Sequence, residues 1–396
     1  MSQKNGRLEK GGGSLNALFS CLASSERRHL LGYIHDHAPA SITRDELATS
    51  LAANKNHSLE QVTNEERKQT LTAIHHVHLP KLDTAGLIRQ NTTDTTVELT
   101  NHPAYQDVDI LAAITDNVSA ESASLDVLFR ALADARRRTI LDVLSHQYHP
   151  IKLQTLAHDI ASTQRGGPPE DVEQVLQSLQ HVHLPHLQEA GLIEYNTDEE
   201  TVVYEGHPLL RVPWMHSELG SNFRATLTDT PKDADIWTID GREKTVSCGQ
   251  SLCEEADEEL FLMFTATGLL EAGCFSRIKQ AADRGVDVYL GTADPTVEGF
   301  VREHAPEVTL WEPQTNWLNL PVDGENVGRL VFADREAVMI GTLGEKSDAG
   351  VHKEQAIFAE GADNTLVILL QQMIRSQFAK LDDQTEDHDS ESQSLF

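Results

Sequence analysis

The chain contains one domain-sized segment twice, and this duplication limits the folds that it can adopt. Residues 74–88, IHHVHLPKLDTAGLI, return as residues 179–193, LQHVHLPHLQEAGLI. Upstream, residues 15–31 return as residues 125–141, and downstream residues 91–103 return as residues 196–208. The repeated unit of roughly 90 residues is the size of a domain rather than of a solenoid repeat. We therefore expect two similar domains and a third that lacks the pattern.

The repeat and the local composition together predict the domain boundaries. The segment between the copies is of mixed composition, and the segment after copy two contains Pro213 and Pro231, which favours linkers. The expected order is a flexible leader at 1–13, copy one at 14–103, a linker at 104–124 with a short helix at 108–115, copy two at 125–208, a linker at 209–233, a third domain at 234–381 and an acidic, disordered tail at 382–396.

Hydrophobic periodicity predicts three helices and a hairpin in each copy. Apolar residues at helical spacing over 125–144 indicate one first helix, and a short second helix follows. The third helix of copy one carries an apolar stripe made of Leu71, Ile74, His78, Leu82 and Ala85. Gly86 and Gly191 then occupy the position where a helix end needs a positive φ. Three helices and a two-stranded wing predict a winged helix-turn-helix.

The third helix of each copy contains a histidine in its apolar stripe and a proline two residues later. His78 and His183 fall in the apolar stripe, so each is expected to be a packed, hydrogen-bonded histidine rather than a metal ligand, and no metal site is predicted. Pro80 and Pro185 lack a backbone N–H and leave a carbonyl one turn earlier without its donor. A kink, or a new helix that starts at the proline, is expected there.

The third domain alternates predicted strands and helices, which favours an α/β sheet. The whole chain is therefore expected to be an α+β and α/β multidomain protein, with two winged helix-turn-helix domains before the sheet domain. The expected elements are strands at 259–264, 286–290, 308–311, 329–332, 337–340 and 355–359, and helices at 269–284, 296–304 and 365–381.

Several of these segments resemble known regulators. Residues 132–141, LADARRRTIL, are similar to the first helix of ArsR-type regulators, and residues 78–88 look like the end of their recognition helix. The chain as a whole resembles haloarchaeal proteins with tandem winged helices. Residues 327–334 resemble the H-x-K-x4-D strand of phospholipase D-like domains, but Val327 replaces the histidine and Arg329 the lysine, and only Asp334 remains. The resemblance implies a non-catalytic effector domain of the TrmB-like type.

The regulator resemblance implies that the exposed face of helix three enters the major groove of DNA. The residues expected to contact bases are Gln69, Thr72 and His76 in copy one and Gln174, Gln177 and His181 in copy two, with Arg67, Lys68 and Lys81 for phosphates. Copy two has no Lys or Arg between Arg165 and Arg211, although phosphate contacts normally supply much of the affinity. The alternative is that one or both copies are docking modules for proteins.

The third domain is expected to sense a small-molecule effector or to form a homo-oligomer. Its candidate ligand-binding residues are Thr265, Asp294, Trp317, Arg329 and Asp334, at strand ends and in loops. The alternative for Asp334 is a structural role in the hairpin turn. Without an imidazole at Val327 a covalent phosphohistidine cannot form, so an enzyme is not expected. No cofactor fingerprint is present.

The charge of the chain indicates its environment. The net charge is −30, from 62 acidic and 32 basic residues, while 39% of residues are hydrophobic, enough for folded cores. A folded chain this acidic is typical of halophilic archaea, where molar salt screens the repulsion within about 3 Å. The alternative is an ordinary acidic protein. Four cysteines without a C-x-x-C pair and no apolar run of membrane length favour a cytoplasmic protein.

Overall fold

The computed structural model divides the chain into two compact units. The first comprises residues 1–144 and 150–223, and the second residues 145–149 and 224–396. Both repeats lie in the first unit, apart from residues 145–149 of copy two. The structure describes residues 13–56, 63–91, 93–115, 122–147, 150–163, 171–216, 227, 236–264, 275–292, 295–311, 327–346 and 352–373.

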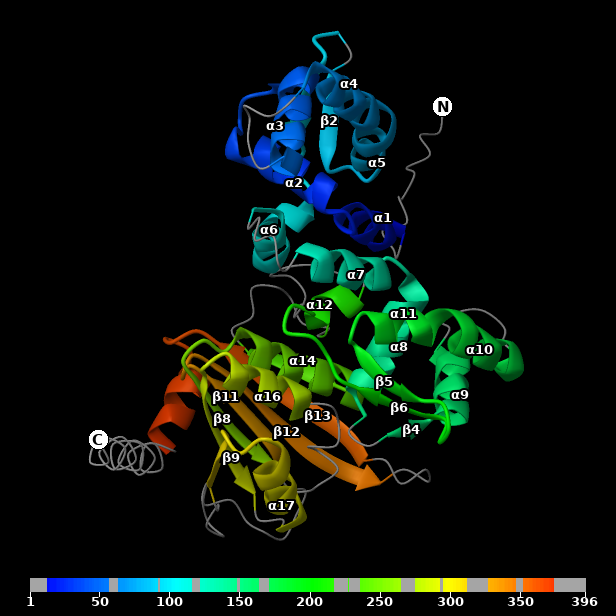
Figure 1. The fold of residues 1–396 in the computed structure, drawn as a ribbon. Helices are drawn as coiled ribbons and strands as arrows, with labels where there is room; N and C mark the ends of the chain where they lie inside the picture. Colours follow the sequence, from blue (N-terminus) through cyan, green and yellow to red (C-terminus); the bar gives the residue numbers. More distant parts are fainter. Residues whose placement is uncertain are drawn as a thin grey trace, which may run out of the picture. The chain divides into compact units, whose positions relative to one another are not determined.

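Each copy has the element order of a winged helix (Figure 1). Copy one consists of α1 (Gly13–Leu22), α2 (Ser25–Asp36), β1 (Ile42–Thr43), α3 (Arg44–Asn56), α4 (Asn64–Ala73), the π-helical η2 (Ile74–His78), α5 (Leu79–Thr84), β2 (Ile88–Asn91) and β3 (Thr96–Leu99). Copy two consists of α7 (Ser122–Leu132), α8 (Ala135–Ser145), β4 (Ile151–Lys152), α9 (Leu153–Thr163), α10 (Val172–Ser178), η4 (Leu179–His183), α11 (Leu184–Glu189), β5 (Ile193–Asn196) and β6 (Thr201–Tyr204). The wings pair antiparallel in the orders β1-β3-β2 and β4-β6-β5. The predicted hairpins are confirmed, and so is the positive φ of Gly86 (74°) and Gly191 (68°).

The prediction of one continuous first helix is wrong, because arginine side chains end it early. In copy one Arg27 donates to the carbonyl of Cys21 (2.7 Å) and Arg28 to that of Leu22 (2.6 Å), the last residues of α1. Copy two repeats the arrangement, with Arg138 donating to the carbonyl of Leu132 at 2.7 Å. These guanidinium groups satisfy carbonyls that the helix end leaves without donors. The chain therefore turns between α1 and α2, and between α7 and α8.

A π-turn lies in the middle of helix three in both copies. The amide of Leu79 donates to the carbonyl of Ile74, five residues back, and the amide of Leu184 donates to that of Leu179. A new α-helix then begins with the proline in its first turn, as expected. The buried residues recur every fourth position, as Thr70, Ile74, His78 and Leu82 and as Val175, Leu179, His183 and Leu187. The expected stripe through Leu71 and Ala85 is therefore displaced, since both are only half-buried.

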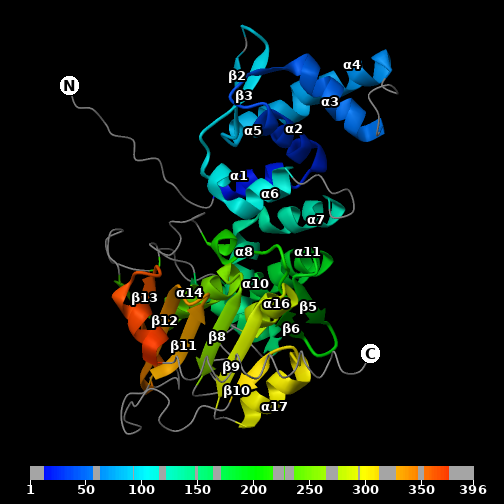
Figure 2. The same ribbon diagram turned by 90° about the vertical axis from the view of Figure 1, so that its left-hand side faces the viewer.

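The two copies pack against each other with reciprocal contacts. Figures 1 and 2 show α1 beside α7, where the Phe19 and Phe129 rings stack with centres 6.0 Å apart. Arg28 of copy one binds the Asp126 carboxylate at 2.6 Å, and Arg138 of copy two donates to the Asn16 side chain at 2.7 Å. Each guanidinium also lies within 6 Å of the other copy's phenylalanine ring, at 5.9 Å and 5.8 Å. The repeats therefore form an internal pseudo-dimer.

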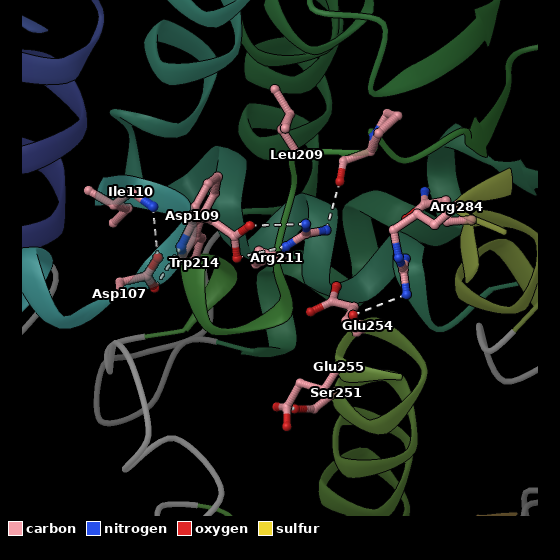
Figure 3. Close-up of polar contacts among 12 residues, drawn as sticks. Asp107, Asp109, Ile110, Leu209, Arg211, Trp214, Ser251, Glu254, Glu255 and Arg284 are labelled. Carbon is pink, nitrogen blue, oxygen red and sulfur yellow. Dashed lines mark hydrogen bonds and ion pairs between the residues drawn. The ribbon is translucent and has the colours of Figure 1, made fainter. Parts of the chain in front are cut away.

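Segments expected to be linkers complete the first unit. The helix predicted at residues 108–115 is confirmed as α6 (Val108–Thr115), which follows the short helix η3 (Pro103–Gln106). Asp107 accepts hydrogen bonds from the amide of Ile110 (2.9 Å) and from the Trp214 indole (3.2 Å), and Asp109 pairs with Arg211 (Figure 3). Trp214, in α12 (Val212–Met215), contacts both stacked phenylalanine rings. These segments therefore hold the two copies together.

The second unit is a mixed sheet of seven strands in the order β10-β9-β8-β11-β12-β13-β7 (Figure 2). Its elements are β7 (Ile236–Asp240), α14 (Arg242–Glu255), β8 (Glu259–Phe264), α16 (Phe275–Asp283), β9 (Asp287–Thr292), α17 (Pro295–His304), β10 (Thr309–Trp311), β11 (Val327–Ala333), β12 (Ala337–Lys346), β13 (His352–Glu360) and a helix over residues 365–373. Strands β8, β9 and β10 are parallel and the others antiparallel. The predicted strands are confirmed.

Two elements of the second unit, β7 and α14, were not predicted. Polar residues separate the apolar ones in α14, although Thr245, Ser247, Gln250 and Ser251 are all buried. Arg284, after α16, donates to the carbonyls of Cys253, Glu254 and Ala256 at the end of α14. Figure 3 shows its contact with Glu254. A helix buried on its polar side chains shows no apolar stripe, which is why periodicity does not reveal it.

Candidate nucleic-acid interface

The predicted base-contacting residues of copy one lie on the exposed face of helix three. Gln69 and Thr72 belong to α4 and His76 to the π-turn, and all three side chains are exposed. The opposite face holds the helix to its domain through the buried Ile74 and Leu82. Amide, hydroxyl and imidazole groups can donate to or accept from base edges. This face can therefore read a sequence without disturbing the core.

Cations surround that face. Lys68 and Lys81 are exposed, and Arg67 is exposed but paired with Asp45 of α3 at 2.9 Å. Arg44, at the start of α3, donates to the side chain of Gln90 at 3.2 Å and lies 3.2 Å from His75 Nδ1. Sequence reasoning missed Arg44, although its place before helix two was visible. The structure gathers these positive charges from α3, α4 and α5.

Copy two keeps the polar triplet but replaces the cations. Gln174, Gln177 and His181 are exposed at the positions of Gln69, Thr72 and His76. The positions of Arg67, Lys68, Lys81 and Arg44 are taken by Val172, Glu173, His186 and Leu153. Exposed carboxylates, including Asp171 and Glu189, add negative charge. The two helices therefore present similar hydrogen-bonding groups in opposite electrostatic surroundings.

In each copy, one buried histidine lies on the inner face of helix three. His78 Nε2 lies 3.1 Å from Glu26 of α2, which also binds Lys55 at 2.5 Å. Burial lowers the pKa of His78, and the nearby Glu26 carboxylate only partly offsets this. His183 is also buried, 4.0 Å from Asp134. The expected burial of both histidines is confirmed, but their hydrogen bonding is incomplete, since neither Nδ1 atom has a hydrogen-bond partner among the described residues. Within the described ranges no group of three His, Cys, Asp or Glu could hold a metal ion.

A cleft of about 510 Å³ lies beside the interface in copy one. It is bordered by α2, α3 and α4, and its walls include His29, Tyr33, Ser50 and the Asp45–Arg67 pair. His29 Nε2 lies 3.0 Å from the Ser50 hydroxyl, and burial lowers the pKa of this imidazole. The cleft therefore shares Arg67 with the exposed face of helix three.

In the second unit the structure places Arg329 and Asp334 at opposite ends of β11. Asp334 accepts hydrogen bonds from the amides of residues 257–259 at 3.1, 2.8 and 2.9 Å and stabilises the hairpin turn. Arg329 is 1% exposed and binds Glu354 at 2.8 Å. Five residues of strand separate the two residues by about 17 Å, and the binding of a small ligand by either of them stays a prediction. Thr265, Asp294 and Trp317 lie outside the described residues.

Both repeats match a single family model. The domain of unknown function DUF7344 matches residues 19–98 and again residues 129–203. No curated protein matches the chain. The structure is similar to TrmBL2, an archaeal chromatin protein whose structure shows a novel mode of DNA binding (12% identity, TM-score 0.28, covering 90% of this chain and 92% of that one). It is also similar to NucT from Helicobacter pylori (12% identity, TM-score 0.28, covering 36% of this chain and 95% of that one).

The family matches coincide with the candidate interface. All nine predicted DNA-contacting residues, from Arg67 to His181, lie inside the two matched segments. The α1–α7 contact lies partly outside them, since Asn16 and Asp126 precede the matched residues. In the described part of the chain no helix combines the length and apolar character that a membrane span requires.

Proposed function

We propose that this chain is a sequence-specific DNA-binding regulator in which helix three of copy one reads the major groove. The observation that carries the proposal is a single exposed face of helix three with both base-reading and cationic groups. Gln69, Thr72 and His76 supply the hydrogen-bonding groups, and Lys68 and Lys81 supply charge beside them. A winged helix presents this element to DNA, with phosphate contacts fixing its register.

Copy two has a different part in this proposal. Its acidic surroundings weaken phosphate contacts, so it binds DNA only where copy one has already anchored the chain. The α1–α7 contact holds the two third helices in a constant relation, as the two subunits of a dimeric regulator do. One chain would therefore present a strong and a weak reader.

The wider proposal concerns the cell and the second unit. We propose a cytoplasmic regulator of a halophilic archaeon, where molar salt reduces the phosphate contribution and leaves more of the specificity to base contacts. The second unit would bind a small-molecule effector or a second copy and shift the DNA affinity of the first. It would not be catalytic, since Val327 supplies no imidazole nucleophile.

The test is selection from a randomised duplex pool by the full chain in molar KCl, followed by affinity measurements. We expect an enriched motif. The Gln69/Thr72/His76→Ala variant should bind it at least about tenfold more weakly, because each lost base contact costs roughly 1–3 kcal/mol. The matched Gln174/Gln177/His181→Ala variant should lose less. A pool without enrichment, or a copy-one variant that binds like the wild type, would overturn the proposal.

A second candidate function is protein docking through copy two. The observation in its favour is the exposed acidic surface around Gln174 and Gln177, with Asp171 at the N-cap of α10 and Glu173 in its first turn. This role is compatible with DNA reading by copy one. It predicts that Glu173→Lys leaves DNA affinity unreduced while abolishing capture of a basic partner, and an unchanged capture would exclude it.

A further inference from the structure

An exposed valine occupies the same position in the π-turn of both copies. Val77 is 55% exposed and Val182 is 50% exposed. Within the described parts of the two repeats and the segments around them, Val108 in α6 is the one other large apolar side chain with comparable exposure. Isolated exposed apolar residues are common and need no explanation by themselves. Two exposed valines at equivalent positions on the proposed DNA-reading helices do need an explanation.

The π-turn determines which way Val77 faces. In a uniform α-helix, Val77 would lie about 80° around the axis from Gln69. In a π-turn the backbone hydrogen bond runs five residues back instead of four. The extra residue rotates the side chains that follow it back around the helix axis, toward the face that carries Gln69. The burial pattern shows the result, because Gln69, Val77 and Lys81 each directly precede a member of the buried line. Gln69, Val77 and Lys81 therefore form one exposed line beside Thr72 and His76.

Packing does not account for the valine. The buried line of Ile74, His78 and Leu82 holds the helix to its domain, and Val77 lies outside it. A β-branched residue is also slightly unfavourable in a helix, because its χ1 rotation is restricted. The same restriction presents two methyl groups in a nearly constant orientation, which suits a contact surface.

We infer that Val77 contacts the 5-methyl group of a thymine in the major groove, so that the recognised sequence contains a thymine opposite the π-turn. Thymine differs from cytosine and from uracil in presenting a methyl group there, and apolar side chains read it by contact. Gln69 and His76 would bind the base edges on either side. The inference rests on the proposed function and adds a preferred base to it.

The experiment replaces thymines by uracil, one at a time, in the duplex that the full chain selects. Uracil pairs like thymine and lacks only the methyl group. We expect wild-type affinity to fall about fourfold at one position, the factor that corresponds to roughly 0.8 kcal/mol for one buried methyl-sized group. Val77→Ala should bind the thymine and uracil duplexes equally. Val77→Thr, which keeps one methyl group, should regain part of the preference.

Val108→Ala is the matched control, since Val108 is 79% exposed and lies in α6, away from helix three. It should show the wild-type preference. A selected duplex in which no uracil separates wild type from Val77→Ala would overturn the inference and leave the proposed function standing. A pool without enrichment would overturn both. Val182→Ala reports whether copy two contributes a second thymine contact, because only then does it remove the preference at another position.

Discussion

At the scale of single residues, the buried Arg329 restricts what its neighbours can be. The guanidinium is paired with Glu354 at 2.8 Å, and both side chains are almost completely buried. Breaking such a pair leaves an uncompensated buried charge, which is strongly destabilising. Gly341, on the neighbouring strand, has no side chain, and the aliphatic part of Arg329 occupies that space. A Cβ at Gly341 would lie 2.7 Å from Arg329 Cγ.

We predict that Gly341→Ala lowers the free energy of unfolding of the second unit by about 1–3 kcal/mol, because the added methyl group displaces Arg329 from its pairing position. Urea denaturation in high salt measures the change. Gly299→Ala in α17 is the control, since nothing lies within 4 Å of its Cβ position and alanine is the better helix former. Equal stability of the two variants would contradict the prediction.

At the scale of elements, helix three depends on how it begins and how it turns. Thr63 and Glu66 form a capping box, in which the Thr63 hydroxyl accepts from the Glu66 amide at 3.2 Å and the Glu66 carboxylate accepts from the Thr63 amide at 2.9 Å. The π-turn then keeps the buried line at four-residue spacing. The cap and the turn together orient the face that carries Gln69 and Val77.

We predict that Thr63→Ala destabilises copy one by about 1 kcal/mol, because the first turn of α4 loses its capping acceptor. Thr72→Ala is the control within the same helix, since the Thr72 hydroxyl donates to the carbonyl of Lys68, one turn earlier, and caps no helix end. Its stability should be unchanged or slightly higher. Hydrogen exchange of the α4 amides reads out the effect, and equal protection in the two variants would exclude a role for the cap.

At the scale of the first unit, the stacked Phe19 and Phe129 rings link the stabilities of the two repeats. Both rings are fully buried, and each copy also inserts an arginine toward the other copy's ring. We predict that Phe129→Ala costs about 3–5 kcal/mol and speeds hydrogen exchange in α1 and α2 of copy one as well as in α7 and α8. Val108→Ala should change neither. Exchange that rises only in copy two would show that the copies fold independently.

Much of the fold was predictable because its signals are local. Hydrophobic periodicity located every strand of the second unit except β7, as well as the second and third helices of each repeat, and the wing hairpins follow glycines at the required positive φ. The polar triplet of Gln69, Thr72 and His76 was found by elimination from the buried face. For Asp334 the sequence left two roles open, and three backbone amides far away along the chain favour the structural role in the hairpin turn.

The sequence by itself determined the duplication, the winged element order and the residues that face outward on helix three, since neighbouring residues encode all of these. The tertiary structure alone decided that Arg27 and Arg28 break the first helix, that a π-turn brings Val77 into line with Gln69, and that the copies pair through α1 and α7. The physical reason is that each of these features depends on which distant carbonyl, ring or core position a side chain meets, and periodicity along the chain does not contain that information.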